Sequence, residues 1–102
     1  MEERAFTYET SEDPRRLVLH GDLDEGTTLQ LRSILNDLSD GLTRDLTVDL
    51  TDVDLLPSSS IGVIASAQAT ARQQDSSLSL VAAEGTISAR VLTICGLAYE
   101  TS

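Results

Sequence analysis

The chain has 102 residues, of which 40% are hydrophobic and 24% charged, and this balance is typical of one globular domain and excludes a disordered chain. Its 17 acidic residues outnumber 7 basic ones, all of them arginine, and the resulting net charge of -10 makes nucleic acid and anionic membranes poor partners. No apolar run approaches the ~18 residues of a membrane span, and no signal-peptide core follows Met1–Arg4, so we expect a cytoplasmic protein.

The first half of the chain predicts two strands followed by a helix. Residues Phe6–Glu9 alternate apolar and polar side chains, Asp13–Pro14 breaks the pattern, and Leu17–His20 resumes it. Such an arrangement indicates two strands joined by a turn. From Leu31 to Leu38, leucine and isoleucine recur at helical spacing, which predicts a helix that Asp40–Gly41 ends.

The next part of the chain predicts a strand and a second helix. Leu46–Leu50 alternates strictly between apolar and polar residues, as a strand with one buried face does. Pro57–Ser60 combines an early proline with hydroxyl side chains that can cap a helix, and this helix is expected to run to about Gln74. Its packed stripe is expected to comprise Ile61, Ile64, Ala67 and Ala71.

The last part of the chain predicts a strand, a short helix and a final edge strand. Leu78–Ala82 is the strand, Thr86 caps the helix that Gly96 ends, and Leu97–Thr101 can add the edge strand. The residues expected to share one helical face are Ile87, Val91, Ile94 and Cys95. We therefore interpret Cys95 as a small buried hydrophobic residue rather than a reactive thiol.

This order of elements indicates an α/β fold. Strands that alternate with helices need crossover connections, which place helices over a mostly parallel sheet. We expect residues 1–102 to form a single domain with a four- or five-stranded mixed sheet flanked by helices.

Motifs for enzymatic chemistry are sparse in this sequence. His20 has no second histidine or cysteine at metal-ligand spacing, so neither a metal nor a cofactor is expected. Ser58 or Ser59 with His20 as a base would make a hydrolase, but the Gly-x-Ser-x-Gly turn that exposes such a serine is missing. We interpret His20 instead as a partly exposed residue at a strand end.

Two short polar motifs allow both a structural and a functional interpretation. Asp22 and Asp24 could act as an acid–base pair, but one of them at this position more often caps the following helix. In the serine run, the hydroxyl of Ser58 or Ser59 could cap the helix, and Ser60 would then face solvent. Alternatively, one of them is phosphorylated, because a helix amino end tolerates the added negative charge.

The stretch Val48–Ile64, which reads Val-Asp-Leu-Thr-Asp-Val-Asp-Leu-Leu-Pro-Ser-Ser-Ser-Ile-Gly-Val-Ile, resembles the signature of STAS domains of the anti-sigma factor antagonist type. The family's strand–loop–helix motif corresponds to Pro57–Val63 at the loop. Gly21–Asp24 is similar to a second family motif, Gly-Glu-Leu-Asp, and Gly96–Leu97 is similar to a closing Gly-Leu. These motifs span nearly the whole chain in the family's order.

The resemblance implies a STAS-like sheet flanked by helices and a bacterial, non-enzymatic regulator of transcription. Its implied partners are an anti-sigma factor that is also a serine kinase, and a serine phosphatase. The unphosphorylated protein would bind the anti-sigma factor and free the sigma factor. Phosphorylation of Ser58, with Ser59 as the competing position, would end that binding. The implied contact residues are Asp22, Asp24, Asp54, Pro57, Ser58, Ser59, Ser60 and Ile61.

The loop departs from the family pattern at two positions. Pro57 stands where the family has aspartate, and Ser60 stands where it has glycine. The alternative interpretation is therefore a STAS scaffold or sensor module that binds its partner constitutively, without serine phosphorylation.

Overall fold

A computed structural model describes residues 4–12 and 14–101 of the chain. Within these residues the elements follow the predicted order, with five strands and three helices. They are β1 (Thr7–Glu12), β2 (Arg15–Asp22), α1 (Glu25–Leu38), β3 (Leu46–Leu55), α2 (Ser58–Gln73), β4 (Leu78–Ala82), α3 (Ile87–Ile94) and β5 (Glu100–Thr101). The turn predicted at Asp13–Pro14 includes Asp13, which lies outside the described residues.

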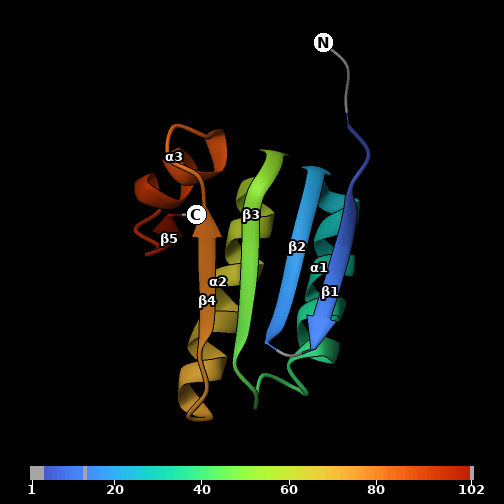
Figure 1. Cartoon of the computed structure of the whole chain (residues 1–102), viewed down its shortest axis with the longest axis vertical. Helices are drawn as coiled ribbons and strands as arrows, with labels where there is room; N and C mark the ends of the chain where they lie inside the picture. Colours follow the sequence, from blue (N-terminus) through green and yellow to red (C-terminus); the bar gives the residue numbers. More distant parts are fainter. Residues whose placement is uncertain (1–3, 13, 102) are drawn as a thin grey trace.

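The strands form one mixed sheet in the order β1-β2-β3-β4-β5, as Figure 1 shows. β1 is antiparallel to β2, and every other neighbouring pair is parallel. Helices α1 and α2 lie side by side on one face of the sheet, behind it in this view. The α/β fold with a mostly parallel sheet is therefore confirmed, and all crossovers between parallel strands are helical.

The core lies between the sheet and helices α1 and α2. Alternate residues of β2 and β3, among them Leu17, Leu19, Val48 and Leu50, are fully buried, as the alternation of these strands predicts. The predicted stripe of α2 is confirmed, because all four of its residues are buried. β3 runs five residues beyond the predicted Leu50, since β2 continues alongside it as far as Asp22.

The prediction of which face of α3 is buried is wrong. Ile87 and Ile94 are 58% and 77% exposed, and Cys95 is an exposed free thiol. The buried residues of α3 are instead Ser88, Ala89 and Leu92. Small residues let the helix approach the sheet closely, and the Ser88 hydroxyl donates a hydrogen bond of 3.1 Å to the Val53 carbonyl.

The amino-terminal segment Arg4–Phe6 crosses the end of β2 at Gly21. The Asp22 amide donates to the Arg4 carbonyl at 3.0 Å, which holds the segment against the strand. Gly21 has a φ of +87°, and a Cβ atom there would lie 2.3 Å from the Ala5 carbonyl oxygen. Glycine is therefore required at this position both for its backbone conformation and for the close approach of another segment.

Candidate functional site

The segments Gly21–Asp24 and Pro57–Ser60, which contain most of the implied contact residues, lie side by side at the carboxyl end of β2 and β3. The Leu23 amide, after β2, donates a 3.0 Å hydrogen bond to the Leu55 carbonyl at the end of β3. Each loop leads into the amino end of a helix, α1 or α2 (Figure 1). This juxtaposition follows because neighbouring parallel strands end at the same edge of a sheet.

Asp24 starts α1 with a capping box. Its carboxylate accepts a 2.8 Å hydrogen bond from the Thr27 amide, and the Thr27 hydroxyl is 2.7 Å from the Asp24 amide. The structural interpretation of Asp24 as a helix cap is confirmed.

The segment Pro57–Ser60, called the serine loop below, leads into α2, and this helix begins in a different way from the one predicted. Pro57 is the capping residue of α2, and no side chain forms a capping hydrogen bond there. The Pro57 carbonyl accepts hydrogen bonds from the amides of Ser60 and Ile61, at 3.0 and 3.1 Å. The prediction that Ser58 or Ser59 caps this helix is therefore wrong, since proline already supplies the extended backbone that a capping residue needs.

Thr28 of α1 connects the two loops. Its hydroxyl lies 3.1 Å from the Ser59 hydroxyl and 3.0 Å from the Ser60 hydroxyl, and it donates to the Asp24 carbonyl at 2.9 Å. Ser60 is fully buried, so the expectation that it faces solvent is wrong. A hydroxyl on the buried stripe of α1, one turn before Leu31, was the sequence signal for this connection.

The three serines therefore occupy three different environments. Ser58 is exposed, and its side chain forms no hydrogen bond or ion pair among the described residues. Ser59 is exposed but is tied to Thr28, and Ser60 is buried. Of the other expected contact residues, Asp22, Asp24, Asp54 and Pro57 reach solvent, whereas Ile61 is buried.

Arg4 neutralises part of the acidic cluster beside the loops. Its guanidinium is 2.8 Å from the Asp52 carboxylate and 2.7 Å from that of Asp54. Its amide donates to the Asp22 carboxylate at 3.2 Å. The guanidinium's hydrogen bond with Asp52, and to a lesser extent the one with Asp54, raises the pKa of Arg4. The hydrogen bond from Arg4, and to a lesser extent the one from His20, lowers the pKa of Asp52. The cluster thus contains a cation that sequence reasoning missed, because Arg4 lies far from its partners in the chain.

His20 completes this charged network. Nδ1 lies 2.6 Å from the Asp52 carboxylate, and Nε2 lies 2.8 Å from that of Glu9. The hydrogen bond with Asp52, supplemented by the one with Glu9, raises the pKa of the imidazole. Carboxylates thus contact both ring nitrogens, and among the described residues no hydrogen bond joins His20 to a serine. The interpretation of His20 as a partly exposed strand residue is confirmed.

In the described part of the chain, no three or more histidine, cysteine, aspartate or glutamate side chains are grouped so as to hold a metal ion. Over residues 4–12 and 14–101, no helix combines the length and hydropathy needed to cross a bilayer. The exposed apolar residue Leu55, two residues before Pro57, was not predicted as part of this surface.

Comparisons with solved structures show the same fold in proteins of low sequence identity. SpoIIAA, an anti-sigma factor antagonist in its unphosphorylated form, matches with a TM-score of 0.72 and 18% identity over 96% of this chain and 86% of its own. A Thermotoga maritima candidate anti-sigma factor antagonist matches with a TM-score of 0.68 and 20% identity, over 94% of this chain and 84% of its own. A Rhodobacter sphaeroides STAS domain matches with a TM-score of 0.52 and 15% identity, over 74% of this chain and 83% of its own.

Sequence comparison identifies the family directly. No curated protein matches the chain significantly. The family described as "Mlab, STAS domain", in contrast, matches residues 6–98. Since this match covers nearly the whole sequence, the chain belongs to the STAS domain family.

Proposed function

We propose that this protein is a cytoplasmic anti-sigma factor antagonist that binds an anti-sigma factor with serine kinase activity and is released by phosphorylation of Ser58. A serine phosphatase would restore the binding form. The family assignment and the likeness to unphosphorylated SpoIIAA support a role in protein binding.

The observation that carries this proposal is the difference between the three serines of the loop. A kinase must reach a hydroxyl that it can turn toward its nucleotide. Ser58 is exposed and unbonded among the described residues, whereas Ser59 is held by Thr28 and Ser60 is buried. Ser58 is therefore the position from which phosphorylation disturbs the fold least.

The charges beside the loop explain how phosphate would end binding. A phosphoserine adds about -1.5 to -2 charges. Arg4, which bridges Asp52 and Asp54, is already paired with both of them. The new charge would therefore increase the acidity of a surface that must meet its partner, without any large change of backbone.

The experiment is phosphorylation by the partner kinase with ATP, followed by peptide mapping and partner capture. We expect phosphate on Ser58. Ser58→Ala should keep partner binding and lose phosphorylation, because the loop stays small and uncharged. Ser58→Asp should bind more weakly, although a carboxylate carries less charge than phosphate.

Ser59→Ala is the matched control, since it removes a hydroxyl from the neighbouring exposed position. It should be phosphorylated like the unmodified protein. Phosphate on Ser59 or on a distant residue would disprove the assignment of Ser58, and equal partner capture by Ser58→Asp and Ser58→Ala would disprove the charge mechanism.

A STAS module that binds its partner constitutively is the second candidate. Two observations favour it: the matching family carries the description "Mlab, STAS domain" rather than that of an antagonist, and Pro57 fixes the backbone immediately before Ser58. In that case the partner would be captured but Ser58 would not be phosphorylated, and Pro57→Asp would be the variant to test for restored modification.

A further inference from the structure

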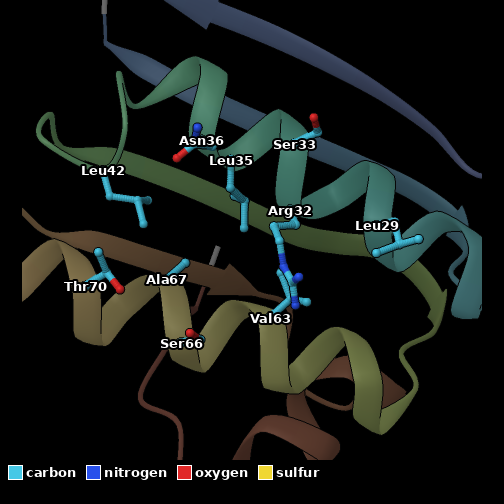
Figure 2. Close-up of a pocket in the computed structure, with 10 residues that line it drawn as sticks. All are labelled: Leu29, Arg32, Ser33, Leu35, Asn36, Leu42, Val63, Ser66, Ala67 and Thr70. Atoms are coloured by element: carbon cyan, nitrogen blue, oxygen red, sulfur yellow. The ribbon is translucent and has the colours of Figure 1, made fainter.

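A groove separates helices α1 and α2 on the face that points away from the sheet (Figure 2). Its volume is about 460 Å³, within the usual range for small-ligand sites. The buried side chains of Leu35, Val63 and Ala67 form its floor. The hydroxyls of Ser66 and Thr70 lie along the α2 wall, so the groove combines an apolar floor with polar edges.

Arg32 gives this groove a positive charge. Figure 2 shows its side chain extending from α1 across the opening toward Val63 of α2. Within the described part of the chain, its guanidinium forms no hydrogen bond or ion pair. The residues one turn away on α1 are uncharged: Thr28, Leu29, Leu35 and Asn36. Arg32 is therefore available to a ligand.

The walls of the groove are free of carboxylates in an otherwise acidic protein. The chain carries 17 acidic residues, yet none lines the groove and none lies on α2, whose charged residue is Arg72. Arg32 is consequently the charged side chain among the residues that line the groove, and apolar walls strengthen its attraction for an anion bound there. A bound anion would therefore face one cation and no carboxylate of the lining.

We infer that the groove between α1 and α2 binds a small amphiphile with a single negative charge, its carboxylate on Arg32 and its apolar body on Leu35, Val63 and Ala67. A guanidinium fork pairs with a carboxylate through two parallel hydrogen bonds. A nucleotide fits poorly, because one arginine would face several phosphate charges. Arg32 is one helical turn from Thr28, which contacts the serine loop, so the carboxylate of the bound ligand would lie about one turn along α1 from that loop. This inference does not depend on the proposed function.

The test is titration of the full chain with decanoate below its micelle concentration, followed by amide NMR. We expect saturable shifts at Val63, Ser66 and Ala67. Acetate, which supplies only the head group, and decanol, which supplies only the tail, should each bind more weakly than decanoate. Arg32→Gln should weaken decanoate binding roughly tenfold, since it removes a charge-assisted hydrogen-bonding pair, and should leave decanol binding unchanged.

Two variants make the result specific to the groove. Arg72→Gln removes the same charge from α2 outside the groove, and it should bind decanoate like the unmodified protein. Ser66→Phe fills the groove from an exposed position, and it should abolish binding of both decanoate and decanol. Equal weakening by Arg32→Gln and Arg72→Gln would overturn the inference, because it would show only long-range attraction. Loss of partner capture in Ser66→Phe, without decanoate binding in the unmodified chain, would also overturn it and assign the groove to protein docking.

Discussion

Single hydroxyl groups decide the structure of the serine loop. Thr28 belongs to α1 but bonds to Ser59 and Ser60, so side-chain hydrogen bonds join the amino ends of α1 and α2, in addition to the backbone hydrogen bond from Leu23 to Leu55. The buried Ser60 hydroxyl has Thr28 as its hydrogen-bond partner. Loss of the threonine hydroxyl would thus leave a buried polar group unpaired.

Thr28→Val should lower the free energy of unfolding by about 1–3 kcal/mol, because valine keeps the shape of threonine and removes its hydroxyl. Chemical denaturation measures the change. The double variant Thr28→Val with Ser60→Ala should recover part of the loss, since both polar partners are then replaced by apolar groups. No recovery in the double variant would show that the bond to Ser60 is not the cause.

His20 provides a pH-dependent contribution to stability. Hydrogen bonds with Asp52 and Glu9 raise its pKa above the usual 6.5, so folding favours the protonated imidazole. This contribution is complete below the unfolded-state pKa and is lost as the pH rises through the folded-state pKa. Because the sequence contains a single histidine, its imidazole protons give an unambiguous NMR titration.

The titration should therefore place the pKa of His20 above 6.5 in the folded protein. The free energy of unfolding should fall with rising pH across the same interval. In His20→Gln this part of the pH dependence should disappear. A folded-state pKa at or below the usual value would contradict the hydrogen-bond network that we describe.

At the scale of elements, α3 shows how tertiary packing overrides local hydrophobicity. The helix offers two rival stripes, and the more hydrophobic one, which contains Ile87 and Ile94, faces solvent. The stripe that packs on the sheet contains the small residues Ser88 and Ala89 together with Leu92. Close approach of the helix to β3 favours the smaller residues.

Leu92→Ala should therefore destabilise the protein by about 2–5 kcal/mol, as expected for a large-to-small change at a fully buried position. Ile94→Ala removes an aliphatic side chain two residues later, where it is 77% exposed, and should change the free energy of unfolding by less than about 0.5 kcal/mol. Thermal or denaturant unfolding distinguishes the two. Equal costs would mean that both stripes are packed.

The order and type of the elements could be predicted because each carries its own apolar period. Strict alternation in Leu46–Leu50 and helical spacing in Leu31–Leu38 depend only on neighbours in the chain. The buried face of α3 and the pairing of Arg4 with Asp52 depend on contacts between distant segments, for which no local pattern exists. The family motif was enough to propose Ser58 as the modified residue. That its side chain forms no hydrogen bond among the described residues could be seen only in the structure.

At the scale of the whole molecule, the amino-terminal segment Arg4–Phe6 packs against the candidate site. It crosses Gly21 and delivers Arg4 to the acidic cluster. Gly21→Ala should place a Cβ atom against the Ala5 carbonyl and displace the segment, in addition to the strain of a left-handed backbone. The expected loss of stability is at least about 1–2 kcal/mol.

Gly41→Ala is the matched control for this prediction. Gly41 also has a positive φ, of +71°, but no heavy atom lies within 4 Å of the added Cβ. Both variants should be destabilised, with the larger loss in Gly21→Ala. Trypsin should also cleave after Arg4 faster in Gly21→Ala than in Gly41→Ala, and equal cleavage rates would show that the segment is not displaced.

The agreement between sheet order and chain order also affects how the domain is made. Each strand pairs with the strand synthesised just before it, so no early strand must wait for a distant one to emerge from the ribosome. β5 contributes two residue pairs to the sheet. The serine loop and its contact with Thr28 are built from elements that precede β5 in the chain, so their assembly does not require β5.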